Sequence, residues 1–224
     1  MKRISTGIKN LDEMMRGGLP EKTVVLLSGN PGSGKTLLSL TYLIEGITKN
    51  ERCVYVSLNE GKEELLKACD GIATLKDARK AIGKSFIIEE LQISEIGSLE
   101  SFTKLFKQYP RVDRLVIDSV NKLLAFSENK SSYRRNMDAL IRTIKEKSTT
   151  SLLVCETEGG QLDSGNGEAY DTDGVVNIEF IDVEEKPMRA ISIFKMRYTA
   201  IDSRVRNKLD VSSKGLTVHN TTVI

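Results

Sequence analysis

The chain has 224 residues, of which 39% are hydrophobic and 29% are charged, a length and composition that suit one α/β domain over residues 1–224. Its formal net charge of +2 gives no general attraction to nucleic acid or to membrane surfaces. One histidine and three widely spaced cysteines argue against a His-based triad or a metal cluster. No apolar run reaches about 18 residues, which argues against membrane insertion. Because no signal peptide is recognised either, we expect a cytoplasmic protein.

Strand-like and helix-like segments alternate along the first two-thirds of the chain. A β-rich apolar run at 23–28 is followed by a glycine-rich break and then by apolar residues at helical spacing over 35–48. Further strands are predicted at 53–58, 85–89, 114–118 and 151–155, and further helices at 61–70, 74–82, 98–109 (ending before Pro110) and 132–147. This alternation predicts an α/β fold with a mostly parallel sheet and helices on both of its faces.

The pattern changes after residue 156. Residues 157–173 are rich in Gly, Asp and Glu and have little apolar content, which predicts a mobile loop. The strands that follow are predicted at 174–181 and 189–197, joined by a turn through Glu184–Pro187, and at 208–212 and 215–219. We expect these strands to form antiparallel hairpins at one edge of the sheet.

The segment from Gly29 to Thr36 matches the phosphate-loop pattern G-x-x-x-x-G-K-[ST] in full and lies between a predicted strand and a predicted helix. Its glycines let successive backbone N–H groups turn toward phosphate oxygens. Lys35 supplies a positive charge for the β- and γ-phosphates, the Thr36 hydroxyl is suited to ligate Mg²⁺, and the dipole of the following helix adds to the attraction. The sequence therefore predicts binding of ATP or a related nucleoside triphosphate with Mg²⁺, through Asn30, Pro31, Gly32, Ser33, Gly34, Lys35, Thr36 and Leu37.

A second acid is expected on a neighbouring strand, where it would hold the water shell of the metal ion. Asp118 ends the apolar run 115–117 and meets this requirement. The alternative is an aspartate that only begins a turn, and Asp113 is a weaker candidate because it precedes the strand. We therefore predict Thr36 and Asp118 as the metal-binding residues.

Several stretches of the chain carry a resemblance to a known family. They are the opening Ile4-Ser5-Thr6-Gly7-Ile8 with Leu11-Asp12 and Gly17-Gly18-Leu19-Pro20, the strand Val116-Ile117-Asp118-Ser119-Val120, and Lys195-Met196-Arg197. Together with the phosphate loop, they resemble a KaiC-type domain of the RecA/RadA superfamily, of the single-domain archaeal KaiC-like or RadA-paralogue type, from residue 3 to about residue 219. The resemblance implies a RecA-like P-loop fold with one copy of the domain.

The resemblance also implies roles for two basic residues. In this family each nucleotide lies between two subunits of a ring or filament, so Lys195 and Arg197 would reach the γ-phosphate held by a neighbouring subunit. Residues two apart on a strand point to the same face, which fits a joint role. The alternative is a pair of solvated basic residues on an edge strand. The resemblance favours a homo-oligomer, with a hexamer preferred, and leaves a protein partner open.

The chain departs from the family pattern at the catalytic base. The family has a glutamate just after the second strand, and this chain has Asn59 there, followed by Glu60. An amide cannot accept a proton effectively, so Glu60 is the candidate base, with Asn59 helping to position water. The alternative is that Glu60 is a surface acid at the start of the next helix. Further departures at 198–201 and 213–215 leave the base specificity, ATP or GTP, open.

Three functions follow as hypotheses. The first is an ATPase that hydrolyses ATP at subunit interfaces, and the second is an ATP-dependent regulatory or assembly module with weak hydrolysis, which Asn59 favours. The third is a recombination accessory protein that binds DNA. The segment 157–173 corresponds to a DNA-binding region of recombinases, yet it carries five acids and no Lys or Arg, which disfavours contact with phosphates. DNA would have to use another surface, such as the one carrying Lys122, Lys130, Arg134 and Arg135.

Overall fold

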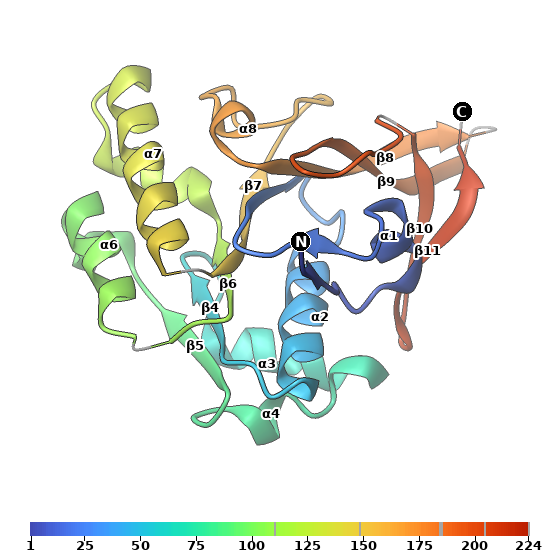
Figure 1. Cartoon of the computed structure of the whole chain (residues 1–224), viewed down its shortest axis with the longest axis horizontal. Coiled ribbons are helices and arrows are strands. Elements are labelled where there is room, and N and C mark those ends of the chain that lie inside the picture. Colours follow the sequence, from blue (N-terminus) through green and yellow to red (C-terminus); the bar gives the residue numbers. More distant parts are fainter. Residues whose placement is uncertain (110, 148, 184–185, 204, 224) are drawn as a thin grey trace.

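The computed structural model describes residues 1–109, 111–147, 149–183, 186–203 and 205–223, and its centre is a nine-stranded sheet (Figure 1). The strand order is β11-β10-β9-β8-β3-β7-β6-β4-β5. Six neighbouring strands are parallel, namely β3 Val24–Gly29, β4 Cys53–Ser57, β5 Phe86–Glu90, β6 Arg114–Asp118, β7 Thr150–Glu156 and β8 Gly174–Val183. The carboxyl ends of these strands therefore meet at one edge of the sheet, where open α/β sheets bind their ligands.

The C-terminal part of the sheet is antiparallel. Strand β9 (Lys186–Met196) pairs with β8, β10 (Asn207–Ser212) pairs with β9, and β11 (Gly215–Thr222) completes the edge. In Figure 1 these strands lie at the side of the molecule away from α6 and α7. The prediction of a mostly parallel sheet with antiparallel hairpins at one edge is confirmed. A separate two-stranded sheet joins β1 (Arg3–Ile4) to β2 (Leu19–Pro20).

Helices cover both faces of the sheet because alternate strand residues point to opposite sides. On β3, Val25 and Leu27 pack into one hydrophobic cluster, whereas Val24 and Leu26 pack into the other. The first cluster lies under α1 (Lys9–Met14), α2 (Lys35–Thr48), α3 (Lys62–Asp70) and α4 (Ala78–Ala81), and the second under α5 (Ile93–Ile96), α6 (Leu99–Lys107) and α7 (Lys130–Glu146).

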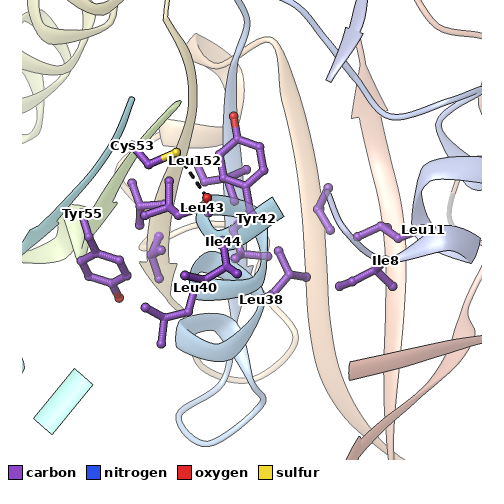
Figure 2. Packing of buried hydrophobic residues seen from close by; sticks show 14 of the residues in the cluster. Ile8, Leu11, Leu38, Leu40, Tyr42, Leu43, Ile44, Cys53, Tyr55 and Leu152 are labelled. Carbon is purple, nitrogen blue, oxygen red and sulfur yellow. Dashed lines mark hydrogen bonds between the residues drawn. The ribbon is translucent and has the colours of Figure 1, made fainter. Parts of the chain in front are cut away.

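Helix α2, which follows the phosphate loop, is the main element over the first face (Figure 2). Its residues Leu38, Leu40 and Leu43 pack with Leu152 of β7 and with residues of α1, and all are buried. The Cys53 thiol donates a hydrogen bond of 3.2 Å to the carbonyl of Leu43. This packing fixes the start of α2 relative to the strand ends.

The structure differs from the sequence predictions mainly in short elements. The helix predicted at 74–82 is a 3-10 turn, Ala73–Leu75, followed by α4, and the segment predicted as a loop contains α8 (Glu168–Asp171). Elements β1, β2, α1, α5 and the 3-10 helix Val120–Phe126 were not predicted, because two to seven residues give too little periodicity. Pro110 and residues 184 and 185 of the predicted turn lie outside the described residues. None of the described helices is long and apolar enough to cross a membrane.

Candidate functional site

The phosphate loop connects β3 to α2 and encloses the ammonium group of Lys35. Gly34, directly before α2, has a φ of 111°, and a Cβ on Gly29 would lie 2.1 Å from the carbonyl oxygen of Ile178, so both positions require glycine. Lys35 Nζ donates hydrogen bonds of 2.8 Å to the carbonyl oxygens of Gly29 and Asn30. Burial lowers the pKa of Lys35, and the nearby carboxylates of Glu156 and Asp118 oppose that shift.

The carboxylate of Asp118 lies beside the start of α2. Thr36 Oγ1 donates to Asp118 Oδ2 over 3.3 Å, and the hydroxyl of Tyr55 donates to the same oxygen over 2.5 Å. Asp118 is only 6% exposed, and burial raises its pKa. Parallel pairing places Asp118 at the carboxyl edge of the sheet, because Asp118 on β6 is in register with Ser57 on β4 and with Val154 on β7.

A cavity of about 490 Å³ opens in front of the loop. One part is polar and contains Lys35, Thr36 and Asp118, whereas another part is apolar. The lining residues are Pro31, Gly32, Gly34, Lys35, Thr36, Leu37, Leu40, Asn59, Glu60, Ala68, Ile72, Asp118, Glu156, Arg189 and Val211. Two predicted loop residues do not line it: the Asn30 amide donates to the carbonyl of Thr157 over 3.4 Å, and the hydroxyl of Ser33 is buried without a partner among the described residues.

Asn59 and Glu60 follow the carboxyl end of β4 and both line the cavity. The Asn59 amide donates to the hydroxyl of Ser119 over 3.2 Å. The backbone of Glu60 is held by Ser57, whose Oγ donates to its carbonyl and accepts from its N–H. Burial raises the pKa of Glu60, and the charge of Asp118 raises it further. Both residues also line a neighbouring cavity of about 570 Å³, so they lie at the boundary between the two.

Lys195 and Arg197 are absent from the lining of the 490 Å³ cavity. Lys195 Nζ donates to the carbonyl oxygens of Ala169, Tyr170 and Thr172, at 3.1, 3.1 and 2.5 Å. Burial lowers the pKa of Lys195, and the charge of Arg197 contributes to that shift. The two residues therefore contact α8 and its surroundings rather than the phosphate loop of the same chain.

Arg197 has a buried acid as its partner. Its Nη1 donates to Asp173 Oδ1 over 3.0 Å, and Lys145 Nζ donates to the same oxygen over 2.8 Å. Asp173 is 2% exposed, and its other oxygen accepts from the N–H of Val24. The Arg197 side chain remains about half exposed, so part of its guanidinium faces outward.

The sequence analysis missed three residues around the cavity. Tyr55 was read only as part of an apolar strand. Glu156 ends β7 much as Asp118 ends β6, and its backbone N–H donates to Asn121 Oδ1 over 2.8 Å. Arg189 on β9 donates from Nη2 to the carbonyl of Gly32 over 3.3 Å and lies 5.0 Å above the ring of Phe180. A strand-end rule could have found Glu156, but no local pattern marks Tyr55 or Arg189.

Comparison with known proteins identifies the family. A family model described as "ATPase: KaiC" matches residues 4–223. The chain belongs to the KaiC ATPase family. It is 30% identical to the UPF0273 protein PH0284 of Pyrococcus horikoshii over 97% of this chain and 94% of that protein. It is also 30% identical to the UPF0273 protein SSO1861 of Saccharolobus solfataricus, over 97% of this chain and 83% of the relative.

A solved structure agrees with this assignment. The KaiC-like protein PH0186 from the hyperthermophilic archaeon Pyrococcus horikoshii OT3 superposes with a TM-score of 0.82 and 25% sequence identity, covering 97% of this chain and 99% of that one. The predicted resemblance to a KaiC-like protein of the RecA superfamily is therefore confirmed, and so is the RecA-like fold.

Proposed function

We propose that this KaiC-family chain binds ATP with Mg²⁺ and hydrolyses it at interfaces between its own copies. One observation carries the proposal: the ammonium of Lys35, the hydroxyl of Thr36 and the carboxylate of Asp118 line one cavity of about 490 Å³, with Glu60 at its wall. A buried cation, a helix start and an acid at neighbouring strand ends are the groups that a nucleoside triphosphate and its metal ion require.

The residues beside the loop fit Mg²⁺. This ion prefers oxygen ligands and keeps several waters, using one or two protein groups together with substrate phosphates. Thr36 would supply a hydroxyl and Asp118 a carboxylate, and no group of three or more His, Cys, Asp or Glu residues suited to a metal occurs in the part of the chain that the structure describes. When bound, the ion would neutralise phosphate charge, while Thr36 and Asp118 hold it and its water.

The rest of the cavity suits the nucleoside. Leu40, Ala68, Ile72 and Val211 give it an apolar wall, on which a base can be buried favourably. Arg189 adds a positive charge next to the carbonyl of Gly32. We assign these residues to the base and sugar end of the nucleotide, without a preference for adenine or guanine.

Glu60 is the proposed base. Its carboxylate would accept the proton of the attacking water, and a pKa raised by burial and by the charge of Asp118 makes it a stronger base. Asn59 is tied to Ser119 and can only orient the water. Lys195 and Arg197 of a neighbouring copy would complete the site, and their separation from the cavity of their own chain is compatible with such a role. A hexameric ring is the proposed assembly.

Steady-state turnover of the full chain with ATP and Mg²⁺ tests this assignment. Glu60→Gln should lower turnover about 100-fold or more and leave ATP affinity within a few-fold, because a neutral amide of the same shape remains in the cavity. Glu95→Gln is the matched control, since Glu95 is an exposed acid of α5 outside the cavity. Unchanged turnover in Glu60→Gln would remove Glu60 from the reaction.

A second function has its own supporting observation. Asn59 occupies the family position of the base, and its amide is engaged with Ser119, so nucleotide binding could serve assembly or regulation with little hydrolysis. Under this alternative, wild-type turnover is near background, Asn59→Glu restores it, and light scattering detects an ATP-dependent change in mass. Fast wild-type turnover that Asn59→Glu does not increase excludes this alternative.

A DNA-binding function receives less support. Among the acids of 157–173, Asp171 accepts from Arg134 over 3.3 Å, and Asp173 pairs with Lys145 and Arg197, so the segment and one basic candidate partly neutralise each other. A fluorescence anisotropy titration with DNA at low salt should detect no binding. Salt-dependent binding would reinstate the recombination hypothesis.

A further inference from the structure

Tyr55 is a buried residue of β4 whose one polar side-chain atom reaches the proposed metal site. Its side chain is 0% exposed and belongs to the hydrophobic cluster under α2, near Leu40 (Figure 2). An apolar position of this kind is usually filled by a residue that needs no partner. The hydroxyl instead donates to Asp118 Oδ2 over 2.5 Å, across to the neighbouring strand β6.

This hydrogen bond is the shorter of two on the same oxygen. Thr36 Oγ1 also donates to Oδ2, over 3.3 Å, whereas no hydrogen bond to Oδ1 is found among the described residues. A hydroxyl that donates to a carboxylate forms one of the stronger hydrogen bonds in proteins. If Thr36 turns its hydroxyl to a metal ion, Tyr55 still holds Oδ2, and Oδ1 remains available to the metal's water.

We propose that Tyr55 is a positioning residue that fixes the orientation of the Asp118 carboxylate for the Mg²⁺-nucleotide complex. The inference rests on the proposed function, because it assumes that Asp118 serves a metal ion. The rigid ring of Tyr55 is enclosed by the core, so the hydroxyl lies at a fixed point relative to β6. At physiological pH a phenol is a neutral hydrogen-bond donor, which matches its bond to the Asp118 carboxylate.

Tyr42 provides a matched control. It is also 0% exposed, belongs to the same cluster, and donates its hydroxyl to a single acceptor, the carbonyl of Thr150, over 2.9 Å. In Figure 2 the hydroxyls of Tyr42 and Tyr55 point toward opposite ends of the cluster. Its acceptor Thr150 is in register with Arg114, at the opposite end of β6 from Asp118, so Tyr42→Phe removes a comparable buried hydroxyl away from the proposed metal site.

Metal binding to the full chain gives a direct readout. Electron paramagnetic resonance would follow Mn²⁺ binding in the presence of a non-hydrolysable ATP analogue, and a fluorescent ATP analogue in EDTA would report metal-free nucleotide binding. Tyr55→Phe should weaken Mn²⁺ binding about tenfold or more, as expected for loss of one hydrogen bond to a charged group. Metal-free nucleotide affinity should stay within twofold, and Tyr42→Phe should match the wild type in both measurements.

A double-mutant cycle separates positioning from general disturbance. If Tyr55 acts through the carboxylate, Tyr55→Phe should cause no further loss of Mn²⁺ affinity in an Asp118→Asn background. Wild-type Mn²⁺ affinity in Tyr55→Phe, an equal loss of metal-free nucleotide binding, or an additive loss in the double variant would each overturn the inference. A wild-type chain that binds no nucleotide would instead contradict the proposed function itself.

Discussion

The cavity at the phosphate loop and the surface around α8 use their charged groups differently. In the cavity, among the described residues, Lys35 Nζ donates hydrogen bonds only to loop carbonyls, and the Asp118 carboxylate accepts from two hydroxyls. Near α8, Lys195 and Arg197, here termed the basic pair, already have carbonyl and carboxylate partners of their own chain. Under the proposed function the cavity would receive the charge of a nucleotide, whereas the basic pair would have to exchange partners before it could reach the nucleotide of a neighbouring copy.

The structure makes such an exchange feasible for Arg197. Asp173 would keep Lys145 and the N–H of Val24 after Arg197 leaves, so no buried charge would lose all of its partners. Lys195 is held more firmly, by three carbonyl oxygens at the end of α8. We therefore expect Arg197 to be the more mobile member of the basic pair.

Replacing Arg197 should have the largest effect on this comparison. Arg197→Ala is expected to lower turnover about 10³-fold, the range known for arginines that reach a neighbour's phosphates, with ATP affinity nearly unchanged. Mixing Arg197→Ala with Lys35→Ala should restore part of the turnover, because some interfaces then combine an intact cavity with an intact arginine. Two inactive variants that remain inactive when mixed would contradict action between copies.

Replacing Lys35 tests the cavity alone. Lys35→Ala should weaken ATP binding about 100-fold, because it removes a charge and its hydrogen bonds from the phosphate position. Isothermal titration with ATP and Mg²⁺ gives the affinity, and Lys9→Ala is the control, since the Lys9 side chain is 88% exposed and is not among the residues that line the cavity. Equal ATP affinities of Lys35→Ala and the control would show that the loop does not bind the nucleotide.

A smaller effect is expected at Asp173, the acid that links Arg197 and Lys145 to the sheet. Asp173→Asn should lower the free energy of unfolding by about 2 kcal/mol, or the melting temperature by roughly 4–8 °C, because two cations lose a buried carboxylate. Thermal denaturation measures this, with the exposed Asp202→Asn as control. A melting temperature unchanged by Asp173→Asn would show that Lys145 and Arg197 contribute little to stability.

The smallest effect is a displaced pH dependence of turnover. The pKa of Glu60 is raised by burial and by Asp118, so the basic form is lost at a higher pH than for an ordinary glutamate. Turnover at saturating ATP and Mg²⁺ should therefore fall with decreasing pH above the usual glutamate range, and Glu60→Gln should lack this acidic limb. The raised pKa also means that Glu60 binds a proton more tightly in the ligand-free fold than in the unfolded chain. The contribution of Glu60 to the free energy of unfolding therefore falls as the pH rises from the ordinary glutamate pKa through the raised pKa of the folded state. A limb in the ordinary glutamate range would contradict the assignment.

The phosphate loop and Asp118 could be predicted because each depends on local sequence. The loop is one continuous motif between a strand and a helix, and Asp118 follows from the rule that parallel strands end at one edge. Their contact through Thr36, at 3.3 Å, is what that rule implies. The mostly parallel sheet followed from the same alternation of strands and helices.

Contacts between distant segments could not be predicted in this way. Tyr55 and Asp118 are 63 positions apart, and Arg189 and Gly32 are 157 apart, so only the folded sheet shows that their polar atoms meet. The acids of 157–173 are typical of a solvated loop, and the sequence therefore predicted one there. Glu168 and Asp173 are nevertheless buried, because Tyr133 and Lys145 approach them from α7.

The N-terminal strand has a practical consequence for assembly experiments. Arg3 donates to the Thr199 hydroxyl over 2.7 Å and to the carbonyl of Tyr198 over 3.0 Å, and Arg16 donates to the carbonyl of Ala200 over 3.2 Å. The chain immediately after Arg197 is therefore fastened to the first residues, with Met1 exposed beside them. An affinity tag fused ahead of Met1 would crowd the face that we expect to meet a neighbouring copy, so untagged protein is the appropriate material for measuring ring formation.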